Sequence, residues 1–148
     1  MILKFIKEVN IQLDFKWQVI MESIKHIFKI GYGPSSSHTM GPQRAVAQFL
    51  KDHPDCNKFI IHLYGSLAAT GRGHLTDKII LDTLNGFEKE IIWHPDIFLE
   101  NHPNSLKIDG YINDKLSYEW TVYSIGGGDI LDEANFLNRR KKSIYPEE

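Results

Sequence analysis

The residues GPSSSHTMGP at positions 33–42, followed directly by QRAVAQFL at positions 43–50, set the local fold of this chain. The first stretch is bounded by Gly-Pro pairs, which break regular structure, and the second has the apolar spacing of an amphipathic helix. Pro42 suits the first helical turn, where its missing N–H is not needed. These residues therefore predict a loop that leads straight into a helix. We expect the buried stripe of that helix to consist of Ala45, Ala47, Phe49 and Leu50.

The loop concentrates four hydroxyls and one imidazole ahead of the helix start. Unpaired backbone N–H groups, the positive end of the helix dipole and rotatable hydroxyls can together bind a carboxylate or a phosphate. A serine-rich N-cap and turn without a ligand is the ordinary alternative, and this stretch alone does not decide between the two. A nucleophilic serine would need an exposed elbow or a paired base, and the sequence shows neither. The expected carboxylate ligands are Ser35, Ser36, Ser37 and Thr39.

Periodic segments in the rest of the chain indicate helices packed on a small mixed β-sheet, which makes an α+β domain. Residues 106–123 have the period-two pattern of an antiparallel hairpin with its turn at Asn113-Asp114-Lys115. In chain order we expect a helix at residues 22–29, the end of the next helix at His53-Pro54, a strand at Phe59–Leu63, a helix at Asp77–Leu84 with Thr76 as its N-cap and with Ile80 and Leu84 facing inward, a strand fragment and a short helix at Asp96–Glu100 within residues 87–104, and strands at Leu106–Ile112 and Ser117–Tyr123.

The composition is that of one globular domain of 148 residues. A formal net charge of -2 argues for neither nucleic acid nor an anionic membrane as a partner. No window reaches the apolar length that spans a bilayer, and charged residues interrupt any signal-peptide core near the N-terminus. The single cysteine, Cys56, cannot form an intramolecular disulfide and fits a reducing cytoplasm. One thiolate also cannot hold an iron–sulfur cluster, which needs three or four.

Two further motifs follow the serine-rich loop. The stretch TGRGHLTDK at positions 70–78 comes after the strand-like Phe59–Leu63, and YSIGGG stands at positions 123–128. Neither glycine run has the spacing of a P-loop or of a dinucleotide site. In this order, the three motifs resemble G-P-S-S-S-H-T-x-G-P, T-G-x-G-H-x-T-D-K and Y-S-I-G-G-G of the beta domain of iron–sulfur-dependent L-serine dehydratases (L-serine ammonia-lyases). The resemblance covers about residues 22–130.

The resemblance implies an enzyme that converts L-serine to pyruvate and ammonia. In that family a [4Fe-4S] cluster is carried by a separate alpha domain, so this chain is expected to bind no metal and to be inactive alone. The implied fold is similar to a substrate-binding domain of some phosphoglycerate dehydrogenases. The implied partners are the cluster-bearing alpha domain or subunit, L-serine and further copies of this chain in a homo-oligomer, all in the cytoplasm.

Removing the weakly acidic α-proton of serine requires a base, and imidazole is suited to this near neutral pH. His74 follows a glycine-containing loop and precedes a helix N-terminus, which favours its neutral form. The resemblance makes His74 the expected general base and His102, in a less closely matched stretch, a second catalytic residue. For His38, substrate contact and a structural role in the loop remain open. The implied substrate-binding residues are Ser35, Ser36, Ser37, His38, Thr39, Gly73, Thr76, Asp77 and Asn104, and the histidines interpreted as structural are His26, His53, His62 and His94.

We expect the domain at residues 22–130, an N-terminal extension or misplaced start at residues 1–21, and a linker or tail at residues 131–148 that includes the basic run Arg139–Lys142. A truncated fused enzyme and a separate small subunit would look alike. The run Gly126–Gly128 is interpreted either as a bulged strand end or as a turn held open near the catalytic domain. The rival function is a non-catalytic module that binds a serine-like effector. The Gly-His-x-Thr-Asp pattern argues against that rival.

Overall fold

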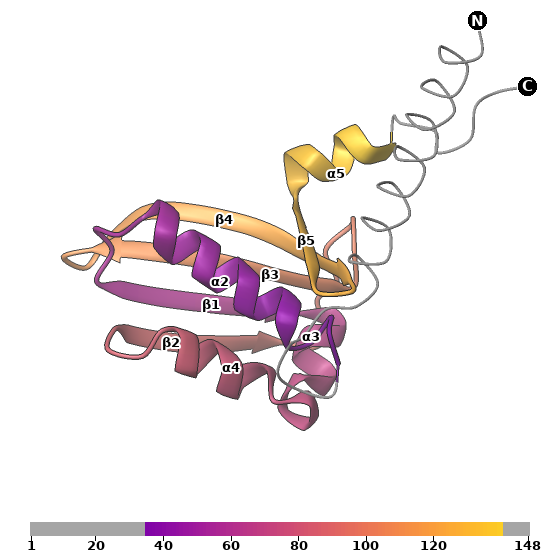
Figure 1. Ribbon diagram of the computed structural model, residues 1–148, viewed down its shortest axis with the longest axis horizontal. Coiled ribbons are helices and arrows are strands. Elements are labelled where there is room, and N and C mark those ends of the chain that lie inside the picture. The colour runs from indigo at the N-terminus through magenta and orange to yellow at the C-terminus, as the bar shows by residue number, and fades with distance from the viewer. Residues whose placement is uncertain (1–34, 141–148) are drawn as a thin grey trace, which may run out of the picture. The chain divides into compact units, whose positions relative to one another are not determined.

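The computed structural model describes the backbone of residues 35–140 and the side chains of residues 35–136. The expected helix at residues 22–29, the extension at residues 1–21 and the end of the basic run lie outside these ranges. The elements are, in chain order, α2 (Met40–Asp52), β1 (Lys58–Tyr64), α3 (Gly65–Thr70), the 3-10 helix η1 (Gly71–His74), α4 (Thr76–Thr83), β2 (Glu88–His94), β3 (Asn104–Ile112), β4 (Lys115–Gly126), β5 (Asp129–Asp132) and α5 (Glu133–Arg140) (Figure 1).

The strands form one five-stranded mixed sheet in the order β2-β1-β3-β4-β5. Only the β1–β2 pair is parallel within the described sheet, and the connection between these strands carries α3, η1 and α4. A parallel pair needs such a crossover, whereas the antiparallel pair β3–β4 closes through a tight turn at Asn113 and Asp114, both with positive φ. The expected α+β class and the hairpin are confirmed.

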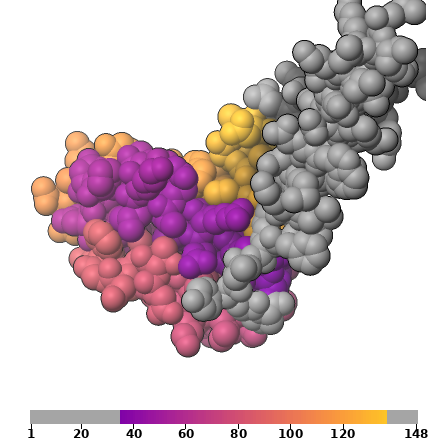
Figure 2. All heavy atoms as spheres, in the orientation of Figure 1, coloured from indigo at the N-terminus to yellow at the C-terminus, as the bar shows by residue number. Residues whose placement is uncertain are grey.

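Helices α2 and α4 lie on the same face of the sheet (Figure 1). Strand β1 shows why, because its fully buried Phe59, Ile61 and Leu63 alternate with side chains that are only partly buried. The buried set points toward the two helices, and the alternate set belongs to the opposite face, which we call the second face. On the helical side, the atoms of α2 and of the α4–β2 region form a continuous surface (Figure 2).

Helix α2 confirms the expected loop–helix unit, with Pro42 in its first turn and its end at His53. Its buried stripe differs in part from the expectation. Ala45 and Phe49 are buried as expected, but Val46 is buried where we expected Ala47, which is exposed. The observed stripe has the regular i, i+3, i+4, i+7 spacing of a helix at Pro42, Ala45, Val46 and Phe49, and Ala47 lies outside it.

Two local expectations were wrong. Thr76 is not the N-cap of α4, because Leu75 takes that position in a left-handed conformation and the Thr76 hydroxyl bonds elsewhere. Residues 96–100 form no helix. The carbonyls of Ile97 and Pro103 instead accept hydrogen bonds from the first N–H groups of α3, at Gly65 and Ser66, both at 2.9 Å. The expected inward positions of Ile80 and Leu84 are confirmed, since both are fully buried.

The sequence interpretation also missed α3, η1, β5 and α5. Strand β5 and helix α5 extend into the range expected to be a linker or tail. Gly126, Gly127 and Gly128 all have positive φ and form the turn between β4 and β5, so this run is a tight connection at a strand end.

Candidate functional site

The serine-rich loop is a compact turn that is bonded to its own backbone. The Ser35 carbonyl accepts the N–H groups of His38 and Thr39 at 3.1 and 2.9 Å and the Thr39 hydroxyl at 2.6 Å. Thr39 is 1% exposed, so its side chain holds the turn and is closed to a ligand. No described residue hydrogen-bonds the Ser36 hydroxyl, which leaves Ser36 as the loop hydroxyl best placed to donate to an anion.

Two distant hydroxyls tie this loop to the domain. Ser124 of β4 donates to the Ser37 carbonyl at 2.7 Å, and the fully buried Thr76 of α4 donates to the His38 carbonyl at 2.6 Å. The chain passes so close to β4 that a Cβ on Gly41 would lie 2.0 Å from the Ser124 Oγ. Only glycine permits this approach. Thr76 therefore positions the loop, since its buried hydroxyl has no open side for substrate.

His38 is surrounded by four hydroxyls. Its Nδ1 lies 3.2 Å from the Ser35 Oγ and 3.1 Å from the Ser37 Oγ, and its Nε2 lies 3.0 Å from the Thr70 Oγ1 and 3.3 Å from the Ser66 Oγ. His38 is 8% exposed, and burial lowers its pKa, as does a positive charge on the neighbouring His74. The inference that no base lies beside the serines was wrong, because a Ser-His dipeptide is too common in sequences to signal such a contact.

His74 stands beside His38, with the ring centroids 4.6 Å apart and the planes tilted by 32°. Its Nδ1 lies 2.9 Å from the Thr70 carbonyl oxygen, and no described residue bonds its Nε2. A carbonyl only accepts, so the proton of neutral His74 is on Nδ1 and the lone pair is on Nε2. The adjacent Gly73 is exposed and His74 itself is partly exposed, so His74 is accessible from the surface of the domain.

The segment from His102 to Asn104, at the start of β3, contacts the N-terminus of α3. Pro103 accepts the Ser66 N–H, Asn104 pairs with Gly65, and a Cβ on Gly65 would lie 2.6 Å from the Pro103 oxygen. The Asn104 N–H donates to the His102 Nδ1 at 3.0 Å, so neutral His102 carries its proton on Nε2. Burial lowers the His102 pKa. The buried Asn104 Oδ1 has no hydrogen-bond partner among the described residues.

The α3–η1 segment therefore connects most of the expected site. It carries His74, contacts His38 through Ser66 and Thr70, and receives the His102–Asn104 loop. Asp77 is not part of these contacts, because its carboxylate accepts the Lys78 N–H at the start of α4. The sequence motifs did not indicate Ser66 and Thr70 as site residues. Their spacing of four residues, repeated from Thr70 to His74, is the signal that could have identified them.

A second pair of histidines lies on the second face of the sheet. The His62 Nδ1 is 3.0 Å from the His94 Nε2, and the His62 Nε2 is 3.3 Å from the Asp109 Oδ2. Asp109 also pairs with Lys107 at 3.1 Å, and Lys107 reaches Glu119 on β4. His62 and His94, two of the four histidines that we interpreted as structural, are thus part of a polar network that crosses four strands.

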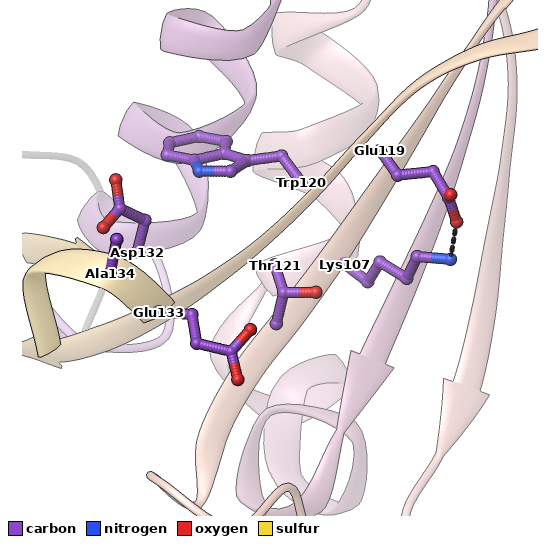
Figure 3. A pocket seen from close by; sticks show the side chains of 7 residues that line it. All are labelled: Lys107, Glu119, Trp120, Thr121, Asp132, Glu133 and Ala134. Carbon is purple, nitrogen blue, oxygen red and sulfur yellow. Dashed lines mark hydrogen bonds and ion pairs between the residues drawn. The ribbon is translucent and has the colours of Figure 1, made fainter. Parts of the chain in front are cut away.

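A hollow of about 470 Å³ lies near the far end of that network. The ion pair of Lys107 and Glu119 forms one side of it, and Asp132 and Glu133 lie opposite (Figure 3). The residues that line the hollow are Lys107, Glu119, Trp120, Thr121, Asp132, Glu133 and Ala134. None of the expected site residues is among them, so the hollow is separate from the His38–His74 pair.

The residues of this chain do not fit an iron–sulfur cluster. Cys56 is the sole cysteine of the sequence, and it is 2% exposed beside Gly110, where a Cβ would lie 2.8 Å from its sulfur. Within residues 35–136, no three His, Cys, Asp or Glu side chains are arranged to hold a metal ion. None of the helices in the described part is long and apolar enough to cross a membrane.

Comparison with known proteins agrees with the motifs. The family model "Serine dehydratase beta chain" matches residues 23–92. L-serine dehydratase 2 of Escherichia coli is 34% identical over 157 aligned positions, which cover 78% of this chain and 34% of the relative. L-serine dehydratase of Haemophilus influenzae is 34% identical with coverages of 85% and 38%, and that of Mycobacterium tuberculosis is 35% identical with coverages of 75% and 33%.

The chain thus spans about a third of the length of these curated relatives. The family-model match contains both the serine-rich loop and the segment with His74, and these are the two segments that the fold brings together. The chain belongs to the serine dehydratase beta-chain family.

Proposed function

We propose that this chain is the beta domain or subunit of an L-serine dehydratase that converts L-serine to pyruvate and ammonia. The observation that carries the proposal is the His38–His74 pair, in which His74 is partly exposed and no described residue bonds its Nε2. A base in this state accepts the α-proton of a bound amino acid. The family membership makes L-serine the substrate that we assign.

The serine-rich loop supplies the groups for the substrate carboxylate. Ser36 has the hydroxyl that no described residue uses, and the loop leads into the N-terminus of a 13-residue helix, whose dipole favours an anion. The unpartnered Asn104 Oδ1 is an acceptor suited to the substrate ammonium group. The roles of Gly73 and Ser36 are to admit and to bind the substrate, while Thr39, Thr76 and Ser37 hold the loop.

His74 is the proposed general base. Its Nδ1–H donates to the Thr70 carbonyl, so a proton taken from the substrate Cα goes to Nε2 and forms an imidazolium. His102 has its proton on Nε2 and is proposed as a hydrogen-bond donor to the substrate. The [4Fe-4S] cluster of the family is proposed to belong to a separate alpha domain or subunit. We also propose a homo-oligomeric assembly and a beta domain at residues 22–130, extended to Asp132 because β5 belongs to the sheet.

The full chain should be combined anaerobically with a cluster-bearing alpha chain, and pyruvate formed from L-serine should be measured. We expect activity from the combination and from neither component alone. Anaerobic reconstitution of this chain by itself should give no iron–sulfur absorbance, because one buried cysteine cannot hold a cluster. Serine binding without pyruvate formation in the combination would favour an effector-binding module, and a cluster band in the chain alone would refute the division of roles.

A further inference from the structure

We propose that Thr70 is a positioning residue that determines which nitrogen carries the proton in both His38 and His74. The Thr70 hydroxyl is hydrogen-bonded to the His38 Nε2, and the Thr70 carbonyl is hydrogen-bonded to the His74 Nδ1. The catalytic consequence rests on the proposed function, whereas the two tautomers are a property of the chain itself.

The Thr70 hydroxyl has one proton, and it donates that proton to the Ser66 carbonyl at 2.8 Å. The oxygen can then only accept from the His38 Nε2, which lies 3.0 Å away. Neutral His38 must therefore carry its proton on Nε2. Its Nδ1 is left as an acceptor for the Ser35 and Ser37 hydroxyls, at 3.2 and 3.1 Å, so both ring nitrogens are used by the protein.

The Thr70 carbonyl accepts from the His74 Nδ1 at 2.9 Å, which leaves the His74 Nε2 as the basic nitrogen. One residue thus bonds opposite nitrogens of two rings that stand 4.6 Å apart. Neither bond adds a formal charge. A carboxylate in the same place would stabilise an imidazolium, whereas a hydroxyl and a carbonyl orient the rings without adding a charge. Threonine is suited to this because its β-branch restricts χ1 while Oγ1 bonds the i−4 carbonyl.

The tautomers can be read from the ring nitrogen chemical shifts of the ¹⁵N-labelled full chain above pH 7. We expect the proton on Nε2 in His38 and on Nδ1 in His74. Thr70→Val keeps the branched shape and removes the hydroxyl, so His38 should lose its single tautomer. Thr70→Ser should retain it. Thr83→Val is the matched control, because the Thr83 hydroxyl makes the same i−4 bond to the Ile79 carbonyl in α4.

In the assembled enzyme, Thr70→Val should lower kcat on the order of three- to tenfold with a smaller change in KM, the effect of one neutral hydrogen bond. Thr70→Ser and Thr83→Val should stay close to the wild type. The proposal is overturned if wild-type His74 carries its proton on Nε2, if Thr70→Val leaves the His38 shifts unchanged, or if Thr70→Ser behaves like Thr70→Val. The wild-type spectrum decides even if a variant does not fold. Because the shifts need no turnover, absence of dehydratase activity would refute the proposed function alone.

Discussion

The chain contains two pairs of neighbouring imidazoles with different partners. His38 and His74, at 4.6 Å between ring centroids, are oriented by hydroxyls and by a backbone carbonyl. His62 and His94, at 5.3 Å, are bonded directly to each other, and His62 also meets the Asp109 carboxylate. The first pair lies between the serine-rich loop and the α3–η1 segment, and the second lies on the second face of the sheet.

The partners determine what each pair can do. In the second pair, both nitrogens of His62 are used within a chain of polar contacts that ends on Lys107 and Glu119. In the first pair, the Nε2 of His74 keeps its lone pair and no carboxylate is bonded to either ring within the described residues. The two pairs differ because no described residue occupies the His74 Nε2, whereas His94 and Asp109 occupy both nitrogens of His62.

The largest expected effect comes from removing the free base. In the assembled enzyme, His74→Ala should lower kcat by about 10²- to 10⁴-fold with a smaller change in KM, because a base acts mainly in the transition state. The matched variant His94→Ala removes an imidazole of the second pair and should leave kcat within about twofold. Steady-state kinetics on L-serine would measure both. Near-normal turnover by His74→Ala would remove this residue from the base role.

The next effect concerns substrate binding beside the first pair. Ser36→Ala removes the hydroxyl that no described residue uses and should raise KM for serine by about 10- to 150-fold, which corresponds to about 1.5 to 3 kcal/mol for a hydrogen bond to a charged group. Ser37→Ala should also affect kcat, because the Ser37 Oγ lies 3.1 Å from the His38 Nδ1. Kinetics of the two variants would separate the roles. A covalent adduct on Ser35, Ser36 or Ser37 during turnover, seen by mass spectrometry, would contradict a binding role.

A pH titration of stability should distinguish the buried His38. Burial and the His74 charge lower the His38 pKa, so below about pH 6.5 the unfolded chain takes up this proton before the folded chain does. The contribution of His38 to the free energy of unfolding should therefore be fully present above that pH. It should decrease as the pH is lowered toward the folded-state pKa. His102, whose pKa is also lowered by burial, adds to the same trend.

The measurement is urea unfolding from pH 5 to 8 in the wild type and in His38→Gln. In the variant, the free energy of unfolding should change less steeply with pH. One histidine contributes at most about 1.4 kcal/mol per pH unit to this slope. Above pH 7 the two curves should run parallel. Stability that increases on acidification from pH 7 to 5.5 would show that the His38 pKa is shifted in the other direction.

The smallest effect is expected on the second face. Asp109→Asn keeps the shape of the side chain and an acceptor for His62 but removes the charge paired with Lys107. We expect a loss of about 1 kcal/mol in the free energy of unfolding and no change in kcat. Asp114→Asn is the control, since the Asp114 side chain is 85% exposed in its pair with Lys58 and should contribute little. A fall in kcat for Asp109→Asn would show that the two pairs are coupled.

Local sequence patterns by themselves determined several parts of this protein. Gly-Pro breakers and apolar spacing predicted α2, the β-branched run at Phe59–Leu63 predicted β1, and Asn113-Asp114 predicted the turn of the hairpin. The inward positions of Ile80 and Leu84 followed from helical periodicity. The three motifs identified the family. These features depend on residues close together in the chain, so propensity and periodicity are sufficient to predict them.

The tertiary structure alone decided which hydroxyls meet which imidazoles. Thr76 has the sequence position of an N-cap, yet its hydroxyl bonds the His38 carbonyl, 38 residues away. Residues 96–100 have a helical composition, yet the Ile97 carbonyl is bonded to the N-terminus of α3. The contacts of His38 with Ser66 and Thr70 join residues 28 and 32 positions apart. Such bonds form only after α2, α3 and the sheet have packed together, because packing, and not local propensity, sets the distance between remote polar groups.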